Sequence, residues 1–151
     1  MRLRWQWGLV AALAALVPLR SCWALDPLCP LWYQRLLYPF VHASFLHWGL
    51  NFFSWVWFHR IVTPFRILVA WACAVAMSFF VPCRFPVLGF SVIIFFFVGY
   101  AFLRWRVSVR LQVAIPVLVS FFFPNIAVWH HIAAFLCGMS YRRLRKLRPH
   151  D

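Results

Sequence analysis

Long apolar runs separated by short groups of basic residues dominate the chain. About 20 apolar residues are needed for a helix to cross a bilayer, and a helix satisfies its own backbone polar groups there. The pattern therefore predicts an all-α membrane protein, with one domain over residues 1–151 that forms a bundle of six transmembrane helices. The predicted spans are 5–25, 40–58, 67–81, 87–103, 107–123 and 126–141.

The number of spans depends on the stretch 111–141, which has no charged residue and could hold one long helix or two short ones. Pro124 and Asn125 favour a break within it. Six spans also place twelve of the fifteen Lys and Arg residues on one side, as the positive-inside rule requires, whereas five spans would move the basic tail across. We therefore expect six helices with both termini cytoplasmic.

The composition supports a membrane location. Hydrophobic residues make up 66% of the chain, and the only carboxylates are Asp26 and Asp151. Such a chain cannot cover a globule with polar surface. The net charge of +13 does not indicate a nucleic-acid partner, because the basic residues form short clusters between apolar runs and no stripe. We expect a multi-pass protein of a bacterial plasma (inner) membrane, with the lipid bilayer as its surroundings.

Two features leave alternatives open. The first span resembles a secretory signal, since a basic start precedes an apolar core and the small residue Ala24, so its cleavage is one alternative. The five cysteines show no paired metal-ligand spacing. A disulfide between Cys22 and Cys29 on an oxidising face is the other alternative.

Polar residues inside the predicted spans are the candidates for function, because they are costly to place in a membrane. His47 and Asn51 share one face of the second span. Ser91 lies about one turn into the fourth span and His131 about one and a half turns into the sixth. A single serine in a membrane helix usually bonds to its own backbone or to a neighbouring helix. The shared depth of all four residues predicts that they act together.

Serine hydrolysis is the chemistry that such a group can perform, with a histidine removing the hydroxyl proton and later delivering it to the leaving amine. Neither carboxylate lies at that depth, so an acidic third member is excluded. We therefore expect a dyad of Ser91 and His131, with His47 and Asn51 as neutral donors to an oxyanion. Gly89 would let the backbone approach the scissile carbonyl and present the Ser91 amide.

Three segments resemble the signature motifs of the rhomboid family of intramembrane serine proteases. Residues 34–51, QRLLYPFVHASFLHWGLN, contain the pattern HxxxxHxxxN of the family's second helix. Gly89-Phe90-Ser91 resembles its GxS nucleophile motif, and residues 131–138, HIAAFLCG, resemble the helix with the general base. The resemblance implies a serine endopeptidase that cleaves transmembrane segments of single-pass proteins and needs no metal or cofactor. The chain's size is similar to that of rhombosortase-like enzymes, which remove C-terminal anchors.

The resemblance also implies a role for each motif residue. Ser91 is the nucleophile and His131 the general base and acid, while His47, Asn51 and the Ser91 amide form the oxyanion hole. His42 is a supporting residue at the helix entrance, because its offset of five residues turns it away from the His47 face. Phe95 stands where an aromatic ring stacks on the catalytic histidine.

His130 is the alternative general base. We prefer His131, because Ala134 and Gly138 follow it at a spacing that permits close helix approach. Val92 and Ala134 depart from the family, since glycine is usual at both positions. These departures favour a second hypothesis, a catalytically silent rhomboid-like protein that binds transmembrane clients. A third hypothesis makes the histidines ligands of a metal or haem; the four are His42, His47, His130 and His131. The substrate and the oligomeric state stay open.

Overall fold

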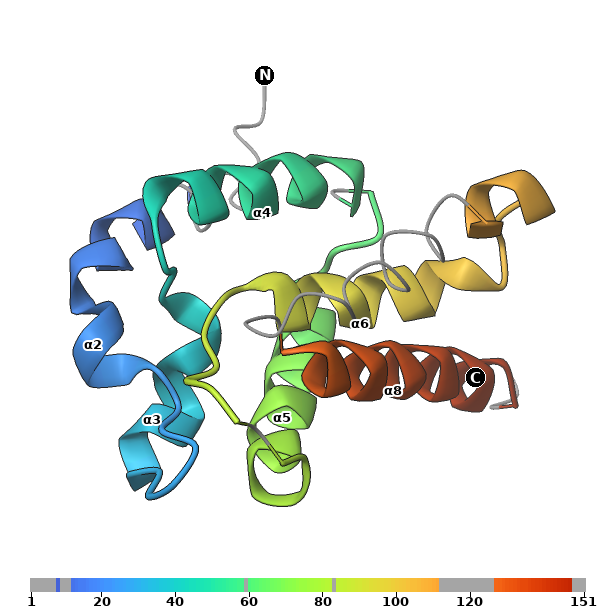
Figure 1. Cartoon of the computed structure of the whole chain (residues 1–151). Helices are drawn as coiled ribbons and strands as arrows, with labels where there is room; N and C mark the ends of the chain where they lie inside the picture. Colours follow the sequence, from blue (N-terminus) through green and yellow to red (C-terminus); the bar gives the residue numbers. More distant parts are fainter. Residues whose placement is uncertain (1–7, 9–11, 59, 83, 112–126, 148–151) are drawn as a thin grey trace.

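The computed structural model of the chain describes all residues except 1–7, 9–11, 59, 83, 112–126 and 148–151. Most of the described residues lie in helices (Figure 1). The elements are η1 (Leu13–Leu19), α2 (Arg20–Trp23), α3 (Trp32–Leu37), η2 (Tyr38–Phe40), α4 (Phe45–Phe58), α5 (Pro64–Phe80), α6 (Ser91–Phe102) and α8 (Val128–Leu147). Residues 107–111 are also helical.

None of the helices in the described part of the chain is both long enough and apolar enough to cross a membrane. Helices α4, α5 and α6 have 14, 17 and 12 residues, whereas a bilayer requires about 20. Helix α8 has 20 residues, but its C-terminal part is basic. The predictions of a six-transmembrane-helix bundle, of a multi-pass membrane protein with cytoplasmic termini and of a bacterial plasma membrane location are therefore wrong.

The predicted spans 40–58 and 87–103 are too long because apolar residues also form the turns before their helices, whereas α5 and α8 are slightly longer than the spans predicted for them. The span 40–58 contains α4 only from Phe45 onward, and the span 87–103 contains α6 only from Ser91 onward. In the first span, η1 includes Pro18 and is followed by the short α2. Most of the fifth span, and the break at 124–125, lie outside the described residues. An apolar run indicates burial, and by itself it does not separate a helix from a buried turn.

The segment from α3 to η2 is hydrogen-bonded to α5 and also to the loop that precedes α6. The Tyr38 hydroxyl donates to the Ala74 carbonyl at 2.8 Å, and the Trp71 indole N–H donates to the Leu36 carbonyl at 2.9 Å. The Tyr38 carbonyl in turn accepts from the Gly89 N–H at 3.0 Å. Since Tyr38 is fully buried, these bonds hold the start of α6 at a defined place.

Helices α6 and α8 lie side by side and run parallel (Figure 1). Their backbones are in direct contact at two glycines. A Cβ atom at Gly99 would lie 1.9 Å from the Phe135 carbonyl oxygen, and one at Gly138 would lie 2.0 Å from the Phe96 carbonyl oxygen. Any side chain at either position would force the helices apart. This close approach aligns the first turn of α6 with the first turn of α8.

The substitution Gly138→Ala is expected to lower the free energy of unfolding by about 2 kcal/mol. Overpacking against a rigid backbone costs about 1–3 kcal/mol, and here the upper end applies because the contact is with backbone atoms. Alanine regains only about 1 kcal/mol of helix propensity. Denaturant unfolding measures the difference.

Gly49→Ala is the matched control for this stability measurement. It lies in α4, where an added Cβ would meet nothing within 4 Å. Only the propensity gain applies, so this variant should be more stable by up to about 1 kcal/mol. Equal stability changes in the two variants would contradict the tight α6–α8 contact.

Candidate active site

Ser91 and His131 face each other across the contact between α6 and α8. The Oγ atom of Ser91 lies 2.9 Å from Nε2 of His131, which is hydrogen-bond distance. Both side chains are half-buried, so an outside molecule can reach them. Ser91 was expected one turn inside a helix, but it is the first residue of α6. There its N–H has no acceptor within the helix, and the helix dipole favours negative charge on Oγ.

Ring packing orients His131. The Phe95 ring, one turn after Ser91, stacks on the imidazole with centroids 4.3 Å apart and planes 7° apart. Among the described residues the only carboxylate is Asp26, whose Oδ1 accepts from the N–H groups of Leu28 and Cys29 in a distant loop. The stacking therefore takes the part that an acidic residue has in a triad, keeping Nε2 directed at Ser91.

His131 is a neutral base at ordinary pH. Burial lowers its pKa from 6.5 to about 4, and nearby His130 and His47 add to the effect. A neutral imidazole that accepts at Nε2 carries its proton on Nδ1. The side chain is thus ready to accept the Ser91 proton.

A reaction in which His131 acts as the base is expected to keep its rate from pH 8 down to about pH 5 and to fall only near pH 4. The base works unprotonated, and a lowered pKa moves the loss of activity to lower pH. At pH 5.5 about 97% of a base with this pKa is unprotonated, against about 9% of an ordinary histidine. A profile of kcat/KM against pH measures this, and a midpoint near 6.5 would contradict it.

Folding has to be verified at each pH in that profile. Burial also lowers the pKa of His42 and of His130 to about 4. The unfolded chain therefore takes up protons near pH 6.5, before the folded chain does. Stability should decrease as the pH falls from about 6.5 towards 4, so only rates of folded protein are compared.

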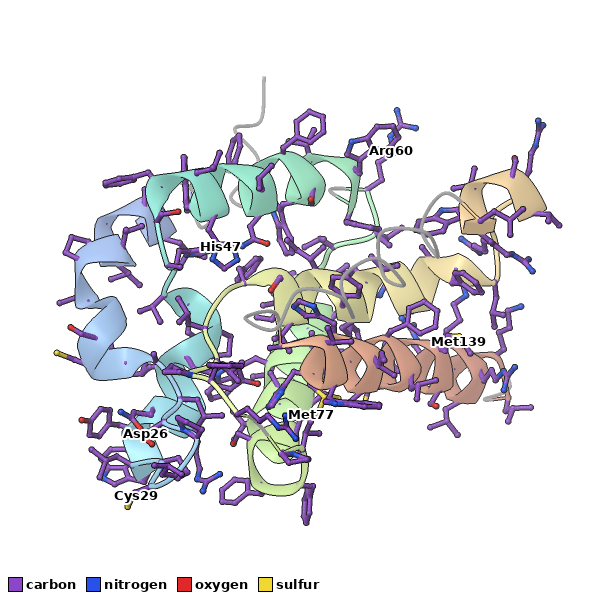
Figure 2. All side chains as sticks on the ribbon, viewed as in Figure 1. Asp26, Cys29, His47, Arg60, Met77 and Met139 are labelled. Carbon is purple, nitrogen blue, oxygen red and sulfur yellow. The ribbon has the colours of Figure 1, made fainter. Side chains whose placement is uncertain are left out.

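His47, in the first turn of α4, and Ser91 both lie next to Gly89. Its Nδ1 accepts from the Ala43 N–H at 3.3 Å, so the proton of the neutral ring lies on Nε2. A side chain at position 89 would lie 3.0 Å from that Nε2 and 3.4 Å from Ser91 Oγ. Figure 2 shows His47 between α4 and the start of α6. Its N–H donates to Ser44 Oγ at 3.1 Å, which fixes this turn.

Gly89 is required where it stands, for two reasons. Its φ of +121° is rare for residues with a side chain, and an added Cβ would lie 2.7 Å from His47 Cε1. The imidazole therefore occupies the space that any other residue would need. Gly89 makes the approach of His47 to Ser91 possible.

Asn51 follows His47 by one turn of α4 and is 5% exposed. Its Nδ2 is buried and has no hydrogen-bond partner among the described residues. A buried donor left without an acceptor costs about 1–3 kcal/mol, so such donors need an explanation. An acceptor on a bound substrate would satisfy it.

The other two histidines of the site region contact no reacting atom. His42 is fully buried and packs edge-on against His47, with ring centroids 5.4 Å apart. His130 packs against Tyr38, with centroids 6.3 Å apart. Of the two adjacent histidines, it is therefore His131 that meets Ser91.

Val92 and Ala134 do not separate the dyad. Both are 1% exposed and pack in one apolar cluster that includes Tyr38 and Val87. The tightest helix contacts lie elsewhere, at Gly99 and Gly138. Sequence reasoning missed Gly99 and Tyr38. An isolated glycine in a phenylalanine-rich helix was a usable signal for Gly99, whereas only the tertiary contacts identify Tyr38.

The side-chain positions bear on the metal and the disulfide alternatives. In the described ranges, no three His, Cys, Asp or Glu side chains are placed to hold a metal ion, so a site of three or more protein ligands has no support there. The thiols of Cys22 and Cys29 are free and exposed, so the disulfide alternative is wrong. A surface hollow lined by Leu25 and Asp26 includes neither member of the dyad.

Comparison with known proteins does not identify a family for this chain. A scan against protein-family models and a search of curated proteins both return no match. The resemblance to rhomboid proteases therefore depends on the motifs alone.

Proposed function

We propose that this protein is a rhomboid-type serine endopeptidase that hydrolyses peptide bonds with a dyad of Ser91 and His131. The observation that carries the proposal is the distance of 2.9 Å between Ser91 Oγ and His131 Nε2. A nucleophile within hydrogen-bond reach of a base, which a third group orients, is the arrangement that activates a serine. Here the third group is the Phe95 ring.

In the first half of the reaction, His131 Nε2 takes the hydroxyl proton while Oγ attacks the scissile carbonyl carbon. The carbonyl oxygen becomes negative, and we propose three donors for it. They are the Ser91 N–H, His47 Nε2–H and Asn51 Nδ2. His131 then gives its proton to the leaving amine, and the acyl group stays on Ser91.

In the second half, water replaces the amine. His131 removes a proton from the water, the hydroxide attacks the ester carbon, and the proton returns to Ser91 Oγ as the acid product leaves. The same three donors stabilise the second oxyanion. No step needs a metal or a cofactor.

The substrate that we propose is an apolar segment of another protein, such as the transmembrane segment of a single-pass protein. Large apolar side chains border the site in sequence and are exposed. Leu46 and Leu50, next to His47 and Asn51, are 74% and 61% exposed, and Trp129 is 61% exposed. Such side chains favour an apolar polypeptide over a polar one.

Labelling by a fluorophosphonate probe, which reacts with activated serines, tests the proposal. We expect the folded chain to be labelled, and Ser91→Ala to abolish labelling. Ser54→Ala is the matched control, because its hydroxyl only donates to the Leu50 carbonyl within α4. Labelling should persist in that control.

Two results would contradict a serine hydrolase. One is a folded chain that the probe does not label, which would favour the catalytically silent, client-binding alternative. The other is equal labelling of the unmodified chain and Ser91→Ala.

A further inference from the structure

Two arginines meet at Tyr100, at the end of α6 remote from the dyad. The guanidinium carbon of Arg66 lies 4.9 Å from the Tyr100 ring centroid, and that of Arg142 lies 4.8 Å from it. Arg66 belongs to the first turn of α5, and Arg142 to the C-terminal half of α8. Tyr100 follows Ser91 by nine residues of α6, or about 14 Å along the helix.

Both cations lack a counter-charge in the described part of the chain. The Nε atoms of Arg66 and Arg142 are buried and have no hydrogen-bond partner there. Arg142 is 7% exposed. Arg66 donates from another nitrogen to the Ile61 carbonyl, which is neutral. Figure 2 labels Asp26, which bears the described carboxylate, far from both Arg60 and Met139. Arg60 precedes Arg66 by six residues, and Met139 precedes Arg142 by three.

The two guanidinium groups lie within about 10 Å of each other, which is about one Debye length at 0.1 M salt, so their charges repel. Buried charges are normally paired, and an arginine removed from water without a partner is destabilising. The Tyr100 ring attracts both cations, but it carries no net charge. An anion shared by the two arginines would supply the missing charge.

A phosphate group fits this arrangement best. It carries up to two negative charges and several acceptor oxygens, which match two forked guanidinium donors. Four further basic residues lie within four positions of Tyr100 or Arg142 in the sequence, and all are exposed: Arg104, Arg143, Arg145 and Lys146. Their field attracts an anion to this end of the molecule.

We propose that Arg66 and Arg142 form a binding site for a phosphate group, separate from the Ser91–His131 dyad. The group can be free phosphate or the phosphate of a lipid headgroup. The proposal does not depend on peptidase activity, because neither arginine contacts the dyad.

Isothermal titration calorimetry of the purified chain in phosphate-free buffer tests the site, with inorganic phosphate as the probe. Arg142→Gln is expected to weaken phosphate binding by at least about tenfold, because it removes one of the two guanidinium groups and its paired N–H donors. Arg143→Gln is the matched control, since the adjacent arginine is exposed and its loss changes the net charge equally. It should alter affinity by no more than about twofold.

Arg66→Gln gives a second test on another helix. It should also weaken binding at least about tenfold, and a loss in both variants cannot come from a local disturbance of α8. If Arg142→Gln does not fold, Arg142→Lys replaces it. That variant keeps the positive charge but lacks the paired N–H donors of the guanidinium group, so it should still bind phosphate more weakly than the unmodified chain.

Short-chain lipids separate the two sources of phosphate. Dihexanoylphosphatidic acid and dihexanoylphosphatidylcholine are compared below their micelle concentrations. Tighter binding of phosphatidic acid than of inorganic phosphate, lost in Arg142→Gln, assigns the site to a lipid phosphate, and equal binding assigns it to free phosphate. The proposal is overturned if no probe binds, or if Arg142→Gln and Arg143→Gln weaken binding equally.

Discussion

Replacing His131 with alanine is expected to lower the rate of peptide hydrolysis by on the order of 10⁴- to 10⁶-fold. The base lies 2.9 Å from Ser91 Oγ, and no other titratable side chain is described at that distance from it. Without it, the hydroxyl proton has no acceptor during attack, and the leaving amine has no donor. The remaining oxyanion donors still stabilise charge, so some catalysis above the uncatalysed rate is retained.

His130→Ala is the control for this prediction. The two histidines are adjacent and both are at least half-buried, but His130 packs against Tyr38 and away from Ser91. It should reduce stability through the lost packing and leave kcat of the folded fraction within about tenfold of the unmodified value. If His130→Ala lowered kcat more than His131→Ala does, His130 and not His131 would be the general base.

The second large effect is expected for Gly89→Ala, which should lower kcat by about 10²- to 10³-fold, the usual loss on removing one oxyanion donor. The new Cβ would lie 2.7 Å from His47 Cε1, and the φ of +121° disfavours alanine. Cε1 is bonded to the protonated Nε2, so a ring displaced by the new Cβ takes the Nε2–H away from the oxyanion. Steady-state kinetics on an apolar peptide measure kcat and KM separately.

Two further variants make this result interpretable. Gly49→Ala, also near His47 in sequence, meets nothing within 4 Å and should leave kcat unchanged. Asn51→Ala removes a second donor without touching the backbone at 89, so it should lower kcat by a similar factor of about 10². If Gly89→Ala folds and keeps the unmodified kcat, His47 is not an oxyanion donor.

The helical character of the chain was predictable from its apolar runs, but the lengths of the helices were not. The run 87–103 contains α6 only from Ser91, because Val87 pairs with Leu25 and Gly89 with Tyr38 before the helix begins. The apolar pattern does not reveal those bonds. Each is made with a residue about 50 or more positions away in the chain, and local pattern contains no information on it.

The sequence by itself determined which residues can do chemistry. Histidine, asparagine, glycine and serine stand at spacings that place His47 and Asn51 on one helix face and Gly89 two residues before Ser91. Helix periodicity alone accounts for the first relation, and the order of residues gives the second. The choice of Ser91 and His131 as partners also followed from the motifs, before any distance between them was measured.

Only the tertiary structure decided how these residues meet. The contacts of Gly99 and Gly138 bring α6 and α8 close enough for Ser91 Oγ and His131 Nε2 to lie 2.9 Å apart. The same packing brings Arg66 and Arg142 to Tyr100 from two further parts of the chain. Such pairings result from packing between helices distant in sequence, whereas spacing along one helix depends only on its own geometry.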